Sequence, residues 1–252
     1  MIKAWAFVRG GGRLVALVVV IIGAVGAYML NRRNRCDAVG KAFWLQNTCR
    51  RALRTLAVSV HSQGAPARGA VIVSNHLSYM DILVLAAVTP VVFVSKKEVR
   101  GWPIFGWFAE KAGTRFIDRT KRGDVSRISK EISPVISADL TVVLFLEGTT
   151  TDGADVLPFK SSLLEPAISH GWKIVPAALN YVVPAGRSVK QEVCWWGDMT
   201  LAPHLLNFAT LPWVRAEVSW GMALSPLDDR KQLAGLLHEQ VSALKAKLGA
   251  GI

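Results

Sequence analysis

The fold that the sequence predicts is centred on Ser74-Asn75-His76-Leu77-Ser78-Tyr79-Met80-Asp81. It follows an apolar run, residues 70–73, that predicts a buried strand, and precedes a second run, residues 82–88, that predicts a helix. His76 is therefore expected at the carboxyl end of a strand, where open α/β sheets carry their functional groups. A neutral imidazole can take a proton from a hydroxyl near neutral pH, and a nearby carboxylate orients it. Asp81 is the candidate for that carboxylate.

The spacing limits how His76 and Asp81 can meet. They cannot share a face of one regular helix, because five residues turn it by about 140°. They can meet if His76 lies in the turn and Asp81 in the first helical turn. Ser78 supports this arrangement, since a serine followed three positions later by an acid is typical of a helix N-cap. The same pattern also fits a simple helix cap, so the spacing alone leaves both interpretations open.

Composition indicates a membrane-surface protein. The chain has 252 residues, 30 Lys and Arg against 18 Asp and Glu, and a net charge of +12. This length accommodates one α/β domain with an appended segment. A basic chain with 51% hydrophobic residues is expected to sit on anionic membrane lipids. We recognise no nucleic-acid-binding module, so nucleic acid is not expected as a partner. The three cysteines match no metal or disulfide spacing, and no metal is predicted.

Residues 14–30 form an uncharged segment between Arg13 and Arg32-Arg33. As a helix the segment is about 25 Å long, at the short end for crossing a bilayer. We expect residues 1–35 to be an uncleaved membrane anchor; a cleaved signal peptide is the alternative. The basic residues after the segment predict that the bulk of the protein lies on the cytoplasmic side of the inner membrane. Because both flanks are basic, a shallow or re-entrant insertion also stays open.

The next segment has apolar residues at helical spacing from Ala38 to Val60, with basic residues on the other side. We interpret residues 36–61 as an amphipathic interfacial helix; a helix packed on the globular domain is the alternative. Residues 62–252 form the predicted domain, a single α/β sandwich around a mainly parallel sheet. Its later strands are predicted at residues 91–94, 141–145, 173–181, 192–196 and 214–220, with helices at 123–138, 203–208 and 227–248.

Four sequence blocks stand in order along the chain: Asn75-His76 with Asp81, Gly113 to Arg119, Glu147-Gly148-Thr149, and Val175-Pro176. Together they resemble the four blocks of the glycerophospholipid acyltransferase family, which includes the bacterial lysophosphatidate acyltransferases. The resemblance covers residues 70–182. It implies an α/β fold on the membrane, a lysolipid acceptor, and an acyl thioester of acyl carrier protein or coenzyme A as co-substrate, with no other cofactor.

The resemblance also implies roles for individual residues. His76 corresponds to the general base and Asp81 to its partner. The residues that it implies around the acceptor are Asn75, Phe116, Arg119, Glu147, Gly148, Thr149, Thr150 and Lys160, with Arg119 and Lys160 as the positive charges. In the implied mechanism His76 takes the proton of the acceptor hydroxyl, whose oxygen attacks the thioester carbonyl without a Ser or Cys nucleophile. Backbone N–H groups after His76 are expected to stabilise the oxyanion.

The third block departs from the family pattern Phe-Pro-Glu-Gly-Thr-Arg, because Leu146 replaces the proline and Thr150 the arginine. That arginine is expected to bind the acceptor phosphate, whereas a threonine offers one neutral hydrogen bond. The run Glu147 to Gly153, with residues 157–163 downstream, is similar to the lyso-ornithine lipid acyltransferase branch.

Three classes of function therefore stay open: an acyltransferase with either of two acceptors, a non-catalytic protein and a hydrolase. The resemblance first implies conversion of 1-acylglycerol-3-phosphate to phosphatidate in phospholipid biosynthesis, with lyso-ornithine lipid O-acylation as the alternative. A non-catalytic membrane-surface protein of the same fold is the alternative from a different class. A membrane-bound hydrolase, with water in place of the acceptor hydroxyl, is a third possibility.

Overall fold

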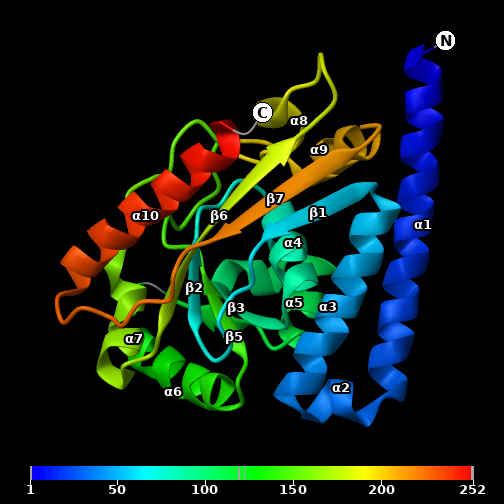
Figure 1. Ribbon diagram of the computed structural model, residues 1–252. Helices are drawn as coiled ribbons and strands as arrows, with labels where there is room; N and C mark the ends of the chain where they lie inside the picture. The colour runs from blue at the N-terminus through cyan, green and yellow to red at the C-terminus, as the bar shows by residue number, and fades with distance from the viewer. Residues whose placement is uncertain (1, 119, 122, 251–252) are drawn as a thin grey trace.

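The computed structural model describes residues 2–118, 120–121 and 123–250, with side chains from residue 5 onward. At its centre is a seven-stranded sheet in the order β1-β7-β6-β2-β5-β3-β4 (Figure 1). Strands β6, β2, β5, β3 and β4 are parallel, β7 is antiparallel to β6, and β1 is parallel to β7. This sheet confirms the predicted α/β sandwich around a mainly parallel sheet. The strands are β1 (Val58–Gln63), β2 (Val71–Ser74), β3 (Val91–Lys96), β4 (Arg115–Ile117), β5 (Thr141–Leu144), β6 (Ile174–Val182) and β7 (Val214–Trp220).

Helices cover both faces of this sheet and bury two separate cores. Val71 and Val73 of β2 belong to one core and Ile72 to the other. Successive side chains of a strand point to opposite faces, so a strand covered on both faces must be apolar throughout. One face packs on α3 (Ala38–Thr55), α4 (Met80–Val88) and α5 (Phe105–Lys111), and the other on α6 (Asp124–Ser137), α7 (Glu165–His170) and α10 (Arg230–Ala250). The shorter elements are α2 (Arg32–Cys36), η1 (Lys97–Gly101), η2 (Ser161–Leu164), α8 (Val189–Glu192) and α9 (Leu201–Ala209).

Helix α1 (Ile2–Leu30) lies along the outside of the domain (Figure 1). Among the described residues its segment Trp5–Leu30 is the one long and apolar enough to cross a membrane, with a mean hydropathy of 2.3. The helix is attached to the rest of the domain at two points. The Arg13 guanidinium donates to the carbonyl groups of Ala209 (3.1 Å) and Pro212 (2.9 Å), beside the end of α9. Further along, the carbonyl of Ala24 accepts a hydrogen bond from the indole of Trp44 in α3 (2.9 Å).

The apolar face of α3 is buried, as the packed-helix alternative expects. Ala42, Leu45, Cys49 and Leu53 lie in the interior, whereas Phe43 is 48% exposed. The predicted extension of this helix to Val60 is wrong. The helix ends at Thr55 and the chain enters β1, which pairs with β7 along the sheet edge. The alternation Val58-Ser59-Val60 suits an edge strand, where one face is buried and the other meets solvent.

The strand predicted at residues 192–196 is also wrong, because α8 ends at Glu192 and a turn follows. The backbone N–H of Trp195 donates to the carbonyl of Leu77 (2.9 Å). The segment therefore packs on the His76 turn instead of joining the sheet. The other predicted strands and helices are confirmed, with ends that shift by a few residues.

Candidate active site

The site is built on the turn that joins β2 to α4. Strand β2 lies between β5 and β6 and ends at Ser74, and α4 begins at Met80. His76 lies in the turn, and its Nδ1 is 2.7 Å from Oδ2 of Asp81 in the first turn of α4. The predicted meeting of the two side chains is thus confirmed. The bond occupies Nδ1 and leaves Nε2 as the nitrogen that can accept a proton; the His76 side chain is 16% exposed.

Asp81 is completely buried, and hydrogen bonds surround its carboxylate. Oδ2 also accepts from the backbone N–H of Leu77 (2.6 Å) and of Ser78 (2.9 Å), and the hydroxyl of Tyr181 donates to Oδ1 (2.7 Å). These donors replace the water that a buried carboxylate has lost. They hold the carboxylate in one orientation against His76.

The predicted serine cap of α4 is wrong. The Ser78 hydroxyl makes no hydrogen bond to any described residue, and α4 has no side-chain N-cap. The physical reason is that the Asp81 carboxylate folds back over the turn and binds the N–H groups of Leu77 and Ser78. These two N–H groups are therefore engaged, and the oxyanion role expected of N–H groups after His76 stays a prediction for the others at the start of α4.

Asn75 fixes the turn to the neighbouring strand β6. Its amide Nδ2 donates to the carbonyl of Leu179 (3.0 Å), and its Oδ1 accepts from the N–H of the same residue (2.8 Å). The side chain is buried and extends the β2–β6 pairing beyond Ser74. Because β6 is longer than β2, it also carries Tyr181 to the level of Asp81.

Glu147 follows β5 and holds the turn from the other side. Its Oε1 accepts from the N–H of His76 (2.6 Å) and its Oε2 from the N–H of Leu157 (2.8 Å). The carboxyl is 2% exposed. Burial raises its pKa, while the two N–H donors act in the opposite direction. Gly148 has a φ of 74°, a left-handed conformation that a glycine adopts without strain, so the chain can turn sharply after Glu147.

The other described residues implied around the acceptor are not bonded to His76. Thr149 is exposed and Thr150 half-buried, directly after Gly148. Lys160 is exposed, and its backbone N–H donates to the carbonyl of Leu146 (2.9 Å), which brings it beside the Glu147 loop. Phe116 lies in β4 at the sheet edge, with Arg100 5.9 Å from the centre of its ring. These four described residues share no hydrogen bond or ring contact with His76, and Arg119 lies outside the described residues.

Three residues of the site were not predicted: Phe145, Thr151 and Tyr181. The ring of Phe145 stacks on the imidazole, with 3.9 Å between ring centres and 12° between planes. The N–H of Thr151 donates to the carbonyl of His76 (3.0 Å). Phe145 is the last residue of the strand predicted at 141–145, and a ring at that position is a usable signal. Tyr181 could be found only with the strand order, because it is 100 positions from Asp81.

The comparisons with known proteins agree with this α/β fold. The sequence pattern of the family described as Acyltransferase matches residues 57–180. The chain belongs to the acyltransferase family, and the predicted resemblance is confirmed.

Two relatives show where in the family the similarity lies. The chain is 39% identical over 186 residues to the lyso-ornithine lipid O-acyltransferase of Brucella abortus (strain 2308), covering 69% of this chain and 70% of that protein. It is 35% identical over 180 residues to the 1-acyl-sn-glycerol-3-phosphate acyltransferase of Neisseria meningitidis serogroup B, covering 71% and 70%. The crystal structure of the 1-acyl-sn-glycerophosphate (LPA) acyltransferase PlsC from Thermotoga maritima shares the fold. It superposes with a TM-score of 0.74 over 99% of this chain and 98% of that one, at 18% identity.

Proposed function

We propose that the protein transfers a fatty acyl group from an acyl thioester to the free hydroxyl of a lysolipid, with His76 as general base. The observation that supports this most directly is the His76–Asp81 pair, in which Asp81 holds Nδ1 and Nε2 makes no bond to any described residue. Nε2 takes the proton of the acceptor hydroxyl as its oxygen attacks the thioester carbonyl. The buried carboxylate stabilises the imidazolium, which returns the proton to the departing thiolate.

The transfer is direct in this proposal, because the neighbouring hydroxyl and thiol are not activated. Burial raises the pKa of the Cys194 thiol to about 12, so the thiol stays protonated and unreactive at neutral pH. The buried Ser78 hydroxyl makes no hydrogen bond to a base among the described residues. An acyl–enzyme intermediate needs a nucleophile with an adjacent base, and His76 serves the acceptor instead.

We propose lyso-ornithine lipid as the preferred acceptor. The half-buried Thr150 stands where the family pattern has an arginine, and a neutral hydroxyl cannot form a bidentate charged contact with a phosphate. The 39% identity to a lyso-ornithine lipid O-acyltransferase supports the same acceptor. Lysophosphatidate is the second candidate. It is favoured by the exposed Lys160, which has no ion pair among the described residues, and by the relative from Neisseria meningitidis.

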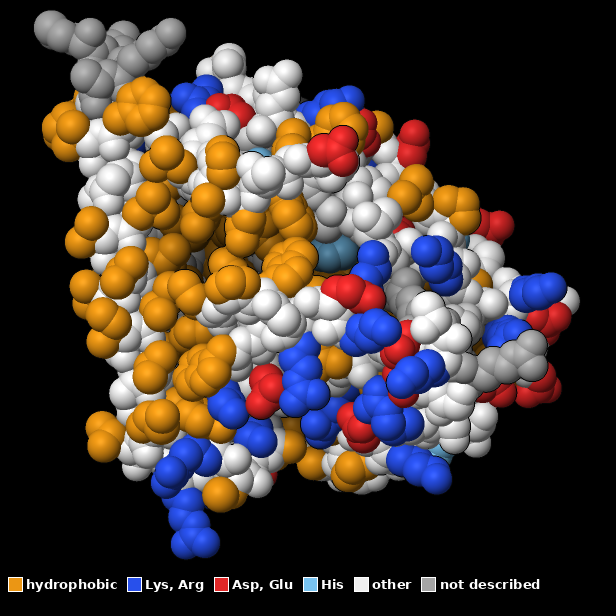
Figure 2. All heavy atoms as spheres, turned by 180° about the vertical axis from the view of Figure 1, so that it is seen from behind, with side chains coloured by type: hydrophobic (Ala, Val, Ile, Leu, Met, Phe, Trp, Pro, Cys, Tyr) orange, Lys and Arg blue, Asp and Glu red, His pale blue; other side chains and the backbone are white. Residues whose placement is uncertain are grey.

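We also propose that the protein lies on the cytoplasmic face of the inner membrane. Figure 2 shows hydrophobic side chains along α1 and across the adjoining hollowed part of the same face. Since α1 is attached to the domain at Arg13 and Ala24, a helix that crossed the bilayer would have to lose these contacts. A helix with one apolar face outward and basic residues beside it suits the membrane interface. The shallow insertion is therefore our preferred arrangement for residues 1–35.

One acceptor panel tests the proposal. Purified protein in vesicles is given lyso-ornithine lipid or lysophosphatidate, each with an acyl-carrier-protein or a coenzyme A thioester, and both acyl product and free thiol are measured. We expect acyl transfer that depends on the lysolipid and is faster with lyso-ornithine lipid. Thiol release without a lysolipid indicates a hydrolase, and no thiol release with any combination indicates a non-catalytic protein. Faster transfer to lysophosphatidate overturns the acceptor proposal alone.

A further inference from the structure

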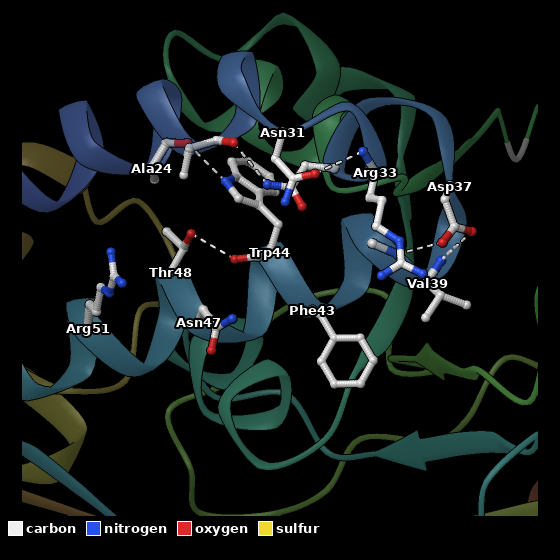
Figure 3. Close-up of a pocket in the computed structure, with 13 residues that line it drawn as sticks. Ala24, Asn31, Arg33, Asp37, Val39, Phe43, Trp44, Asn47, Thr48 and Arg51 are labelled. Carbon is white, nitrogen blue, oxygen red and sulfur yellow. Dashed lines mark hydrogen bonds between the residues drawn. The ribbon is translucent and has the colours of Figure 1, made fainter.

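A pocket separate from the His76 turn opens in the helical hairpin formed by α1, α2 and α3 (Figure 3). Its volume is about 430 Å³, and residues 24–51 alone line it. Polar and aromatic side chains from α3 and from the α1–α2 corner surround the space in Figure 3: Asn31, Arg33, Phe43, Trp44, Asn47 and Arg51.

The charge of the pocket is positive and unneutralised. Arg33 and Arg51 lie toward its two ends (Figure 3), and neither guanidinium makes an ion pair or hydrogen bond with a described residue. The acid in the lining is Asp37, which is the only acid among the first 55 residues of the sequence. Its carboxylate accepts from the N–H groups of Val39 (3.2 Å) and Gly40 (3.3 Å) at the start of α3. Asp37 is therefore engaged as a helix cap, and the two arginines are available to an external anion.

The surroundings of the pocket are apolar and exposed. Ala27, on the pocket wall, borders the outward side of α1, where Ile22 is 64% and Leu30 89% exposed. Phe43 stands at the rim from the α3 side. Exposed apolar patches of this kind mark membrane or protein contacts. An anion-binding pocket at the end of such a patch matches a molecule with a charged head and an apolar tail.

We propose that this pocket binds the headgroup of an anionic phospholipid of the bilayer, a lipid that is neither donor nor acceptor in the reaction. A guanidinium of Arg33 or Arg51 binds the phosphate by charge-assisted hydrogen bonds, and Asn47 offers its amide to the rest of the headgroup. The acyl chains lie along the outward face of α1. The bound lipid fixes the depth and orientation of the hairpin at the interface. This inference rests on the membrane placement proposed above and is independent of the acceptor.

The test compares two double variants of the full chain that lose the same charge. Arg33→Gln/Arg51→Gln empties the pocket of its cations. Arg32→Gln/Arg54→Gln removes two exposed arginines of the same helices that do not line it. Binding is measured by flotation with phosphatidylcholine vesicles, with and without phosphatidylglycerol. Both variants lose the general attraction of a basic residue to an anionic surface. We expect the pocket variant to lose about tenfold more affinity for phosphatidylglycerol vesicles, because it also loses charged hydrogen bonds.

Several outcomes decide the matter. Equal losses in the two variants, with both still folded by circular dichroism, overturn the proposal and leave only general electrostatic attraction. Glycerol 3-phosphate that competes with the vesicles at similar concentration also overturns it, because the site then binds a free anion and not a membrane lipid. A His76→Ala protein should bind vesicles like the unaltered chain, so that failure of the catalytic proposal is seen separately. If the unaltered chain binds no vesicles, the proposed membrane placement is wrong, and the proposed lipid site is wrong with it.

Discussion

The hydroxyl of Tyr181 donates a 2.7 Å hydrogen bond to Oδ1 of Asp81, the oxygen that His76 does not contact. Tyr181 is 2% exposed, and burial raises the pKa of its phenol well above the usual value, so the hydroxyl stays a donor at every working pH. The tyrosine does not reach the reacting atoms. It orients the carboxylate that orients the imidazole, and we regard it as a positioning residue.

Replacing Tyr181 by Phe should lower kcat about tenfold or more, because a hydrogen bond to a charged group contributes about 1.5–3 kcal/mol. Tyr79→Phe is the matched control, since Tyr79 is half-buried in the same region but its hydroxyl bonds to His204. Equal loss of kcat in both variants argues for a packing role.

Removal of the proposed base should abolish turnover. We expect His76→Ala to reduce acyl transfer by about 10²–10⁴-fold, the usual contribution of a general base. Asp81→Asn should be strongly impaired as well, because an amide cannot stabilise the imidazolium and turns a donor toward the N–H groups of the turn. Product formation is measured beside a thermal melt, and near-normal transfer by a folded His76→Ala protein contradicts the mechanism.

Glu147→Gln separates a structural role from an acceptor-binding role. One of the two backbone N–H groups of His76 and Leu157 then faces an amide NH₂ instead of an oxygen. A buried donor without a partner costs about 1–3 kcal/mol. We therefore expect a lower midpoint of chemical unfolding together with lower kcat. An unchanged midpoint with a raised KM for the lysolipid would show that the carboxylate acts mainly on the acceptor.

Thr150→Arg should increase the preference for lysophosphatidate over lyso-ornithine lipid by about one to two decades. This factor corresponds to the 1.5–3 kcal/mol of a charged hydrogen bond. Thr149→Arg is the control, because it places the same charge one position away on an exposed residue. The ratio of kcat/KM for the two acceptors is the measurement. If the two variants change this ratio equally, Thr150 does not occupy a special position toward the phosphate.

The pH dependence of stability should report His204. Burial lowers its pKa from the usual 6.5, against the opposing effect of its bond to the carbonyl of Cys194. The unfolded chain therefore binds a proton at a higher pH than the folded chain. The contribution of neutral His204 to the free energy of unfolding is complete above about pH 6.5. It is lost as the pH falls through that value toward the pKa of the folded state. His204→Gln keeps a donor for Cys194 and should flatten the fall in melting temperature below pH 6.5.

The sequence alone predicts the centre of this fold better than its edges. Strands β2, β3 and β5 are buried on both faces, so their apolar runs identify them without knowledge of their partners. Strand β1 has no such signal. It is an edge strand with three exposed residues at its end, and its register, Val58 opposite Val214, depends on a strand far along the chain. Its two valines continue the helical spacing of α3 closely enough to be assigned to the helix.

In the site, too, local contacts could be predicted from the sequence and contacts between distant segments could not. The His76–Asp81 pair is local, and a turn followed by a helix allows the two side chains to meet, although the spacing also fits a simple helix cap. The bonds from Glu147 to the N–H of His76 and from Tyr181 to Asp81 join segments about 70 and 100 positions apart. They depend on strand order, which residue spacing does not contain. Arg13 is a further example. The sequence indicated only a charged residue beside an apolar segment, whereas in the fold its guanidinium binds the carbonyl groups of Ala209 and Pro212 at the end of α9.

The attachment of α1 to the end of α9 has a consequence for the synthesis of the protein on the ribosome. Arg9 and the carbonyl of Thr210, which are hydrogen-bonded in the structure, are 201 positions apart. A ribosome adds roughly 5–20 residues per second, so α1 leaves it about 10–40 s before its partner segment exists. During that interval the part of α1 that contacts α9 lacks its partner in the folded domain. In the membrane placement that we propose, the bilayer covers this apolar surface until the C-terminal half of the domain has been made.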